Sequence, residues 1–364
     1  MKGLDFLIEA QAPGKLYIAG EYAVVETGYP AILVALDQFI RVRVSPSHGY
    51  GTIYSQQYKE NSIHWRRKGN QIVLDNRDNP FHYILSAIRI TEEYVQLQTQ
   101  RPLTTYDLTI DSDLDSVDGK KYGLGSSAAV TVATIKALCQ FYNLAITKNT
   151  LFKLAAIAHF EVQGNGSLGD IAASVYGGWI AYHSFDREWL LVARQQLSLE
   201  QLLATDWPQL AIEQLTPPPA LKLVIGWTGS PASTSRLVDA VSLIKAQKHQ
   251  GYQAFLTASK DCIHQLITGF KNHDLAQIKA GIRANRQILS NLAQISQVDI
   301  ETPLLTRLID IAEEMEAAAK TSGAGGGDCG IAITDSDTAA TTIRNQWQAH
   351  GIEPLALQVH TITE

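Results

Sequence analysis

A glycine-rich segment in the first half of the chain has the clearest chemical potential. Positions 123–129 read GLGSSAA, and a run with helical apolar spacing follows. Glycines let a backbone approach a ligand and turn its N–H groups inward. A helix start adds unpaired N–H donors and a partial positive charge. Ser126 and Ser127 add hydroxyls that can bond phosphate or coordinate Mg²⁺. The segment therefore predicts a cradle for a di- or triphosphate, with an ordinary serine-capped helix start as the alternative.

Other phosphate-binding and catalytic signatures fit poorly. The segment matches the loose dinucleotide pattern GxGxxA, but the turn-rich DSVDGKK precedes it where a strand should end. The acidic residue expected about twenty positions later is also missing, since residues 128–160 contain no Asp or Glu. The P-loop pattern, the HRD and DFG signatures of protein kinases and GxSxG are absent. A dinucleotide-dependent oxidoreductase is therefore disfavoured.

Two further segments carry functional residue types. Residues 13–22 read PGKLYIAGEY, which taken alone is a turn with a lysine. Residues 320–330 read KTSGAGGGDCG and hold five glycines. Such a run costs backbone entropy inside a folded domain, which predicts a functional loop with room to move rather than a linker. The ten histidines show no metal-ligand spacing, and we assign them no role.

Composition bounds the class of protein. The 364 residues are 45% hydrophobic and carry a formal net charge of −6, which favours folded domains and argues against a nucleic-acid backbone as partner. The three cysteines are far apart and form no CxxC pair, so neither a disulfide framework nor a zinc ribbon is expected. No stretch reads as a signal peptide or as a membrane span. The sequence predicts a soluble cytoplasmic protein.

The pattern of elements predicts an α+β fold in two domains. The N-terminal residues 6–25 look like β structure with a Pro-Gly turn. Further strands are expected over residues 31–46, 104–114, 221–229, 330–335 and 354–363. Helices are expected over residues 79–98, 128–144, 148–164 and 336–351, and in three patterns between about 235 and 320. Because residues 216–220 read TPPPA, which helices and central strands tolerate poorly, we place the domain boundary between residues 217 and 218.

The three glycine-containing segments occur in one order that resembles a known family. PGKxxxxGEY near the start, GLGSSAA near position 125 and GAGGGD near position 325 form the pattern of the GHMP kinases. The segments APGKLYIAGEYAVV, KYGLGSSAAV, GNGSLGDIA and GWTGSPASTSRLV look most like the bacterial phosphomevalonate kinases of this family. The resemblance implies an N-terminal domain similar to ribosomal protein S5 domain 2 (residues 1–217). It also implies a ferredoxin-like C-terminal domain (residues 218–364), with the active site between the two.

The resemblance also implies a reaction and a set of site residues. It implies ATP-dependent conversion of 5-phosphomevalonate to 5-diphosphomevalonate with Mg²⁺, in the mevalonate pathway of isoprenoid biosynthesis. Lys15, Asp170 and Lys121 would act at the reacting phosphates. The ATP-binding residues would be Gly123, Leu124, Gly125, Ser126, Ser127 and Ala128. The substrate-binding residues would be Lys15, Ser167, Gly325, Gly326, Arg283 and Arg286. Ser127 and Glu161 would be near the metal.

Five of these residues also have a simpler interpretation. Lys15 could be a surface turn lysine, and Asp170 could cap the helix that begins at IAASVY. Arg283, Arg286 and Glu161 could be solvated helix-surface residues.

The chemistry of the expected acceptor leaves the role of Asp170 open. A phosphate monoester loses its second proton near pH 6, so the acceptor needs no strong base at neutral pH. Asp170 could therefore act as an orienting group for a lysine or metal-bound water, or as a general base. Because two anions must meet, we expect cations to outnumber carboxylates in the site.

Two alternatives of function stay open. One is a kinase of the same fold with another acceptor, such as mevalonate or a sugar, because acceptor pockets are scattered over loops. The other is a non-catalytic nucleotide sensor, although such a protein need not keep Lys15, Ser126, Ser127 and Asp170. The expected partner is a small-molecule substrate, with no nucleic acid and no membrane. A homodimer is compatible with the sequence.

Overall fold

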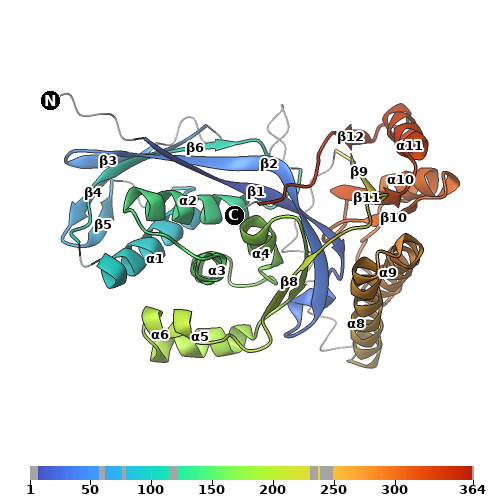
Figure 1. Ribbon diagram of the computed structural model, residues 1–364, viewed down its shortest axis with the longest axis horizontal. Helices are drawn as coiled ribbons and strands as arrows, with labels where there is room; N and C mark the ends of the chain where they lie inside the picture. Colours follow the sequence, from blue (N-terminus) through green and yellow to red (C-terminus); the bar gives the residue numbers. More distant parts are fainter. Residues whose placement is uncertain are drawn as a thin grey trace.

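The computed structural model shows two units joined side by side, each built around its own sheet (Figure 1). The structure describes residues 7–56, 62–75, 79–99, 101–114, 122–229, 237 and 249–362. The α+β class predicted from the sequence is confirmed, because the two sheets are almost wholly antiparallel and helices pack against them.

The first unit is a large twisted sheet covered by helices. Its strands are β1 (Ile8–Ala19), β2 (Pro30–Pro46), β3 (Tyr50–Ser55), β4 (Ile63–Lys68), β5 (Gln71–Leu74), β6 (Tyr106–Ser112), β7 (Trp179–His183) and β8 (Ala211–Leu215). They run in the order β5-β4-β3-β6-β2-β7-β8, and β1 pairs with β2. The central strand β2 is buried without alternation over residues 31–36, as expected of a strand covered on both faces.

Four helices place the functional segments under this sheet. They are α1 (His82–Thr99), α2 (Ser126–Phe141), α3 (Lys148–Gln163) and α4 (Gly169–Tyr176). Helix α2 packs against β1 and β2, and α4 lies beside it against β1 (Figure 1). A short 3₁₀ turn, η1 (Ala23–Val25), follows β1. Helices α5 (Arg187–Gln196) and α6 (Leu199–Ala204) lie between β7 and β8 in the chain, and α6 packs against α1 and α3. Because α2 and α4 both pack on β1, their starts converge on one region of that strand.

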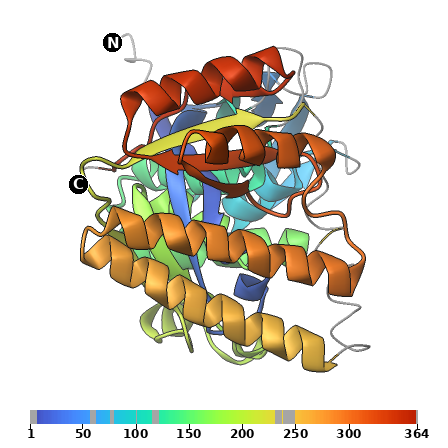
Figure 2. The same cartoon turned by 90° about the vertical axis from the view of Figure 1, so that its right-hand side faces the viewer.

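The second unit is a four-stranded antiparallel sheet with helices on both faces. Its elements are β9 (Lys222–Trp227), α8 (His249–Lys271), α9 (Leu275–Ser296), α10 (Pro303–Glu314), β10 (Ala318–Thr321), β11 (Cys329–Thr334), α11 (Asp337–Ala349) and β12 (Glu353–Leu355). The strand order β10-β11-β9-β12, with helices after β9 and β11, is the ferredoxin-like arrangement. Figure 2 shows α10 and α11 on one side of the sheet and the pair α8–α9 on the other.

Side chains of the second sheet alternate between these two layers. Ile331 and Ile333 join the core cluster that contains α8 and α9 residues, whereas Ala332 between them joins the cluster of α10 and α11. The first of these clusters is continuous with the core of the large sheet. Successive strand residues point to opposite faces, so the face of the second sheet that carries Ile331 and Ile333 shares a core with the first unit.

Two sequence-based expectations differ from the structure in detail, and a third is not tested. Pro13-Gly14 is not a turn between strands but an irregularity inside β1, where the pairing with β2 shifts register. The last strand is only Glu353–Leu355; the chain then returns to the first unit, where Val359 bridges Leu36. The domain boundary at 217/218 stays a prediction, and it is supported by the change of sheet between β8 and β9.

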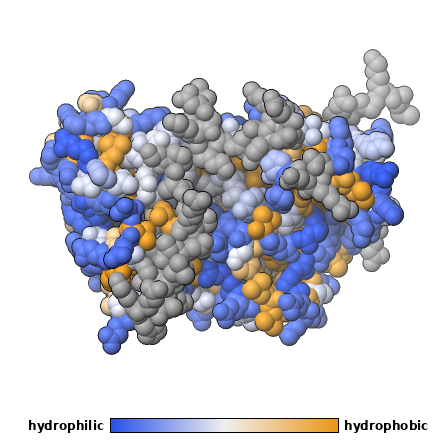
Figure 3. Space-filling model, turned by 180° about the vertical axis from the view of Figure 1, so that it is seen from behind, coloured by the Kyte–Doolittle hydropathy of each residue, from blue (hydrophilic) through white to orange (hydrophobic). Residues whose placement is uncertain are grey.

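Few large apolar side chains are exposed among the described residues: Leu7, Tyr50, Leu97, Leu191 and Val192. On the face in Figure 3, apolar residues lie in groups separated by hydrophilic ones. None of the described helices is both long enough and apolar enough to span a bilayer. All three cysteines, Cys139, Cys262 and Cys329, are buried and free, in line with the expected absence of a disulfide framework.

Candidate active site

The irregularity in β1 positions Lys15. Pro13 lies opposite Phe39, but Lys15 lies opposite Ala35, so the strand is re-aimed between them. The Lys15 backbone N–H then donates to the Leu124 carbonyl at 2.8 Å, and its Nζ donates to the Gly123 carbonyl at 3.0 Å. Two motifs that are more than a hundred residues apart in the sequence are therefore joined at this lysine.

The close approach of Lys15 explains the glycine at position 125. Gly125 has a φ of +81°, a region that favours glycine, and an added Cβ would lie 2.9 Å from the Lys15 Cε. A larger residue would be strained and would displace the lysine stem. Glycine at position 125 is therefore required to make room for the Lys15 side chain, independently of any ligand.

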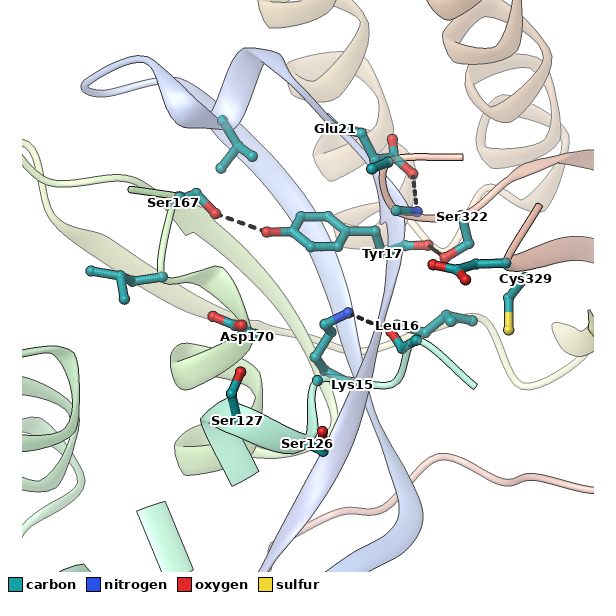
Figure 4. A pocket seen from close by; sticks show the side chains of 18 of the residues that line it. Lys15, Leu16, Tyr17, Glu21, Ser126, Ser127, Ser167, Asp170, Ser322 and Cys329 are labelled. Atoms are coloured by element: carbon teal, nitrogen blue, oxygen red, sulfur yellow. Dashed lines mark hydrogen bonds between the residues drawn. The ribbon is translucent and has the colours of Figure 1, made fainter. Parts of the chain in front are cut away.

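A cavity of about 460 Å³ lies beside Lys15, between the two units. Its lining comes from β1, the starts of α2 and α4, the end of α3, and the second unit's glycine loop (residues 321–328) with the residue after it. Figure 4 shows Lys15, Ser126, Ser127 and Asp170 around one part of it, and Tyr17, Glu21 and Ser322 around another. All three motifs recognised in the sequence thus meet at one cavity.

Helix α2 begins without a side-chain cap. Its N-cap is Gly125 in the left-handed conformation, and no side chain accepts a hydrogen bond from the first turn. The interpretation of GLGSSAA as an ordinary serine-capped helix start is therefore wrong. The uncapped N–H groups and the positive end of the helix dipole are suited to an anion, as expected for a phosphate cradle.

Asp170 lies in the first turn of α4, with its carboxylate at the cavity. The N-cap of α4 is Leu168, so the interpretation of Asp170 as the capping residue is wrong. Its Oδ1 accepts from the Ile171 N–H at 3.0 Å. Burial first, and then the Asp170 charge, raise the pKa values of the Tyr17 and Tyr83 hydroxyls above their usual range. Both phenols are therefore neutral donors at the cavity, and Tyr17 Oη pairs with Ser167 Oγ at 2.8 Å.

His159 is a cavity residue that the sequence did not reveal. It is 1% exposed near the end of α3, and its Nε2 lies 3.1 Å from Ser127 Oγ. The Tyr83 ring stacks on it with centroids 4.8 Å apart. Burial lowers the pKa of His159 below 6.5, although the Asp170 charge opposes this, so the imidazole is neutral at pH 7. Its hydrogen bond can orient the Ser127 hydroxyl at the cavity. Metal-ligand spacing, the only signal considered for the histidines in the sequence, could not reveal this residue.

We expect His159→Phe to lower kcat about 2- to 10-fold, because Ser127 loses one hydrogen-bond partner while the ring stack on Tyr83 is kept. The variant also tests the neutral state. A histidine with a lowered pKa binds fewer protons folded than unfolded, so its contribution to stability is present above pH 6.5 and is lost as pH falls. The melting temperature should therefore fall less steeply between pH 7 and 5 in the variant. If the pH dependence of the melting temperature and kcat are both unchanged in the variant, His159 neither is held neutral by burial nor orients Ser127.

Several predicted site residues lie away from the cavity. Glu161 pairs with Arg89 and Arg194, so the expected metal role of Glu161 is not supported. Arg283 pairs with Glu313 at 2.7 Å, and Arg286 pairs with Glu301 at 2.7 Å. Both arginines line a separate cavity behind the glycine loop and do not reach the site. Their guanidinium groups are engaged by carboxylates rather than turned to an anionic substrate.

The remaining predicted residues have supporting positions. Leu124 and Ala128 are buried, and Leu124 acts through its carbonyl on Lys15. Gly325 and Gly326 pack against Ile300, whose carbonyl accepts from the Gly326 N–H at 2.9 Å. The loop residues that line the cavity are Ser322, Gly323, Ala324 and Asp328. Lys121 lies outside the described residues.

The charge balance differs from expectation in the described part of the cavity. Three carboxylates, those of Glu21, Asp170 and Asp328, line it, against one lysine, Lys15. We expected cations to outnumber carboxylates, and among the described lining residues they do not. Lys320 already pairs with Glu21, and a divalent cation bound with the ligand could supply further positive charge.

Comparisons with known proteins agree with this arrangement. Residues 82–178 match the GHMP kinases N terminal domain, and residues 266–353 match the GHMP kinases C terminal domain. A phosphomevalonate kinase from Streptomyces sp. strain CL190 is 37% identical over 96% of both chains.

Solved structures give the same picture. A Lin0012 protein from Listeria innocua is 40% identical with a TM-score of 0.92 and covers 98% of both chains. Streptococcus pneumoniae phosphomevalonate kinase, in complex with phosphomevalonate and AMPPNP, is 31% identical with a TM-score of 0.86, covering 97% of this chain and all of that one. The chain belongs to the GHMP kinases.

Proposed function

We propose that the protein transfers the γ-phosphoryl group of ATP to the phosphate of 5-phosphomevalonate, giving 5-diphosphomevalonate and ADP. One observation carries the proposal: Lys15, the uncapped start of α2, Asp170 and the glycine loop of the second unit surround one cavity. It is supported by the 37% identical phosphomevalonate kinase and by the pneumococcal enzyme that binds phosphomevalonate and AMPPNP.

The proposed roles follow from the geometry. The start of α2 would hold the nucleotide phosphates, with Ser126 and Ser127 at its N-terminus. Lys15 would offset the charge of the two phosphates as they approach, because phosphoryl transfer depends mainly on positioning and charge neutralisation. An acceptor phosphate oxygen forms the new bond to the γ-phosphorus, while the bond from that phosphorus to the β,γ-bridging oxygen of ATP breaks and the oxygen leaves as part of ADP. Asp170 would orient the groups that carry positive charge.

The donors at the cavity fit Mg²⁺ as a cofactor of ATP. In the described part of the chain, no three His, Cys, Asp or Glu residues are grouped as a complete metal site. Mg²⁺ in phosphotransferases is usually bound by one or two carboxylates with substrate phosphates and water. Asp170 and the Ser127 hydroxyl could supply such ligands. When bound, the ion would neutralise phosphate charge.

Of the alternatives, a non-catalytic sensor is less well supported. Binding alone would not require a lysine and an aspartate at one cavity beside the uncapped helix. Another acceptor remains the nearer rival, because the fold alone does not select an acceptor. Cytoplasmic location, a homodimer and the absence of nucleic-acid and membrane partners stay predictions.

The acceptor is tested by ADP release over a panel of mevalonate, 5-phosphomevalonate, 5-diphosphomevalonate, homoserine and galactose. We expect turnover that depends on both 5-phosphomevalonate and Mg²⁺. Release without an acceptor serves as the background. Equal or faster turnover with mevalonate would contradict the acceptor while leaving the kinase, and no release above background with any acceptor would favour a sensor.

A further inference from the structure

A buried ion pair crosses from one unit to the other beside the cavity. Lys320, at the end of β10 in the second unit, donates from Nζ to Glu21 Oε1 of the first unit at 2.5 Å. The two side chains are 0% and 2% exposed. Glu21 follows β1 in the GEY part of the first motif, and Lys320 precedes the glycine loop. None of the roles proposed above uses either residue.

Strand β1 and the turn that follows it, residues 20–22, bind three successive residues of the glycine loop. Ser322 Oγ donates to the Tyr17 carbonyl at 2.7 Å. The Gly323 N–H donates to Glu21 Oε1 at 3.3 Å. The Tyr22 hydroxyl donates to the Ala324 carbonyl at 2.5 Å. Since Gly323 and Ala324 line the cavity, these bonds set where the loop stands over it.

The backbone of this turn is unusual. Tyr22 has a φ of +62°, which is strained for a bulky residue, and Gly20 has a φ of +94°. A Cβ at Gly20 would lie 2.6 Å from the Pro30 carbonyl oxygen, so only glycine fits. Strained residues persist only where the surroundings over-determine them. Here the strain lets two successive side chains, those of Glu21 and Tyr22, both reach the glycine loop.

Stability alone is a poor explanation for a charged pair at this place. Two buried charges lose hydration, and apolar residues of similar size are often at least as stabilising. Within the described chain, Glu21 Oε2 has no hydrogen-bond partner, which adds to the cost. What an apolar pair could not supply is the oxygen that accepts from the Gly323 N–H.

We propose that Glu21 is a positioning residue: its side-chain oxygen fixes Gly323 of the glycine loop over the reacting phosphates, and Lys320 compensates the charge of that buried carboxylate. The catalytic part of this inference rests on the proposed function. The placement of the loop does not, because it is a property of the protein without substrate.

The test compares two double variants with wild type. Glu21→Gln/Lys320→Met removes both charges but keeps an amide oxygen for the Gly323 N–H. Glu21→Leu/Lys320→Met removes that oxygen as well. We expect both to melt near the wild-type temperature, because neither leaves an unpaired buried charge. Only the Leu variant should show amide hydrogen exchange over residues 322–326 that is about tenfold faster.

The kinetic readout separates positioning from folding. In the Leu variant kcat should fall about tenfold or more, since small misplacements of catalytic groups are costly. Its KM for the acceptor should change less than about twofold, because the Tyr17–Ser167 side of the cavity is untouched. The Gln variant should keep kcat within about threefold of wild type. Lys222→Met, which removes the exposed ion pair with Asp337 in the same sheet, is the matched control and should resemble wild type.

Wild-type exchange and kcat in the Leu variant would overturn the proposal, as would equal defects in the two double variants. If either double variant fails to fold, Glu21→Gln and Glu21→Leu, which both leave Lys320 without its carboxylate, are compared with each other. Faster exchange over residues 322–326 in the Leu variant than in the Gln variant supports the proposal, and equal exchange overturns it. A wild-type protein without kinase activity would refute the proposed function, yet the exchange result would still decide the placement of the loop.

Discussion

Replacing Lys15 by alanine is expected to lower kcat by roughly 10²–10³, the effect of losing one preorganised charge donor. Lys15 Nζ is directed into the cavity and bonds only the Gly123 carbonyl among the described groups. No carboxylate within the described chain forms an ion pair with it, so its charge is available to the phosphates. Nucleotide affinity should change little, because in the proposed function the uncapped start of α2 would provide most of the phosphate contacts. Both quantities are measured by steady-state kinetics and by titration with a non-hydrolysable ATP analogue.

Lys15→Met is the matched control for this prediction. The methionine stem can still pass over Gly125, where an added Cβ would lie 2.9 Å from the lysine Cε, and the backbone bond to Leu124 is unaffected. If charge is what matters, Met and Ala should lower kcat to a similar extent. Recovery of turnover in the Met variant would show that Lys15 acts by packing the glycine segment, and near wild-type turnover in both would reduce it to a structural residue.

The sequence allowed most elements to be predicted, because those signals are local. The meeting of the three motifs at one site was implied by the resemblance to the GHMP kinases and not by any local signal. The N-cap Ser336 of α11 and Gly164 at the end of α3 are examples in which one residue defines an end. The Pro13-Gly14 pair was misread because turn residues also suit an irregular strand. That distinction depends on β2, which pairs with both sides of the irregularity.

The errors at the site arise from contacts between distant segments. Arg283 and Arg286 look like anion-binding arginines until their partners Glu313 and Glu301 are known. Glu161 lies two positions after His159 on α3, and helix rotation takes the carboxylate out of the cavity and brings the imidazole in. The sequence alone does not show which face of α3 is turned to the cavity, so it could not tell whether His159 or Glu161 lies there.

Asp170→Asn is expected to lower kcat about 10²-fold, as a positioned charge at the cavity is lost. Asparagine keeps an oxygen that can accept from the Ile171 N–H, so the start of α4 should be preserved. Circular dichroism and the melting temperature check this. The size of the loss does not distinguish an orienting group from a general base, since base contributions of about 10²–10⁴ overlap it. The pH dependence of kcat/KM does.

The acid limb of kcat/KM for 5-phosphomevalonate should lie near pH 6 in wild type, where a phosphate monoester takes up its second proton. Because this limb belongs to the substrate, it should persist at the same pH in Asp170→Asn. Besides Asp170, His159 is a described group at the cavity that could titrate in this range. Burial lowers its pKa and the Asp170 charge opposes the shift, so loss of that charge would lower the pKa further.

The profile from pH 5 to 9 in both proteins therefore has three distinct outcomes. A limb that stays in place assigns the ionisation to the acceptor and supports the orienting role of Asp170. A limb that moves to lower pH in the variant assigns it to His159, and its disappearance in His159→Phe would check that. A limb that disappears in Asp170→Asn makes the carboxylate the titrating group, and the orienting role is then wrong. Titration of free 5-phosphomevalonate by ³¹P NMR fixes the reference, because a dianionic acceptor gives a base no proton to remove.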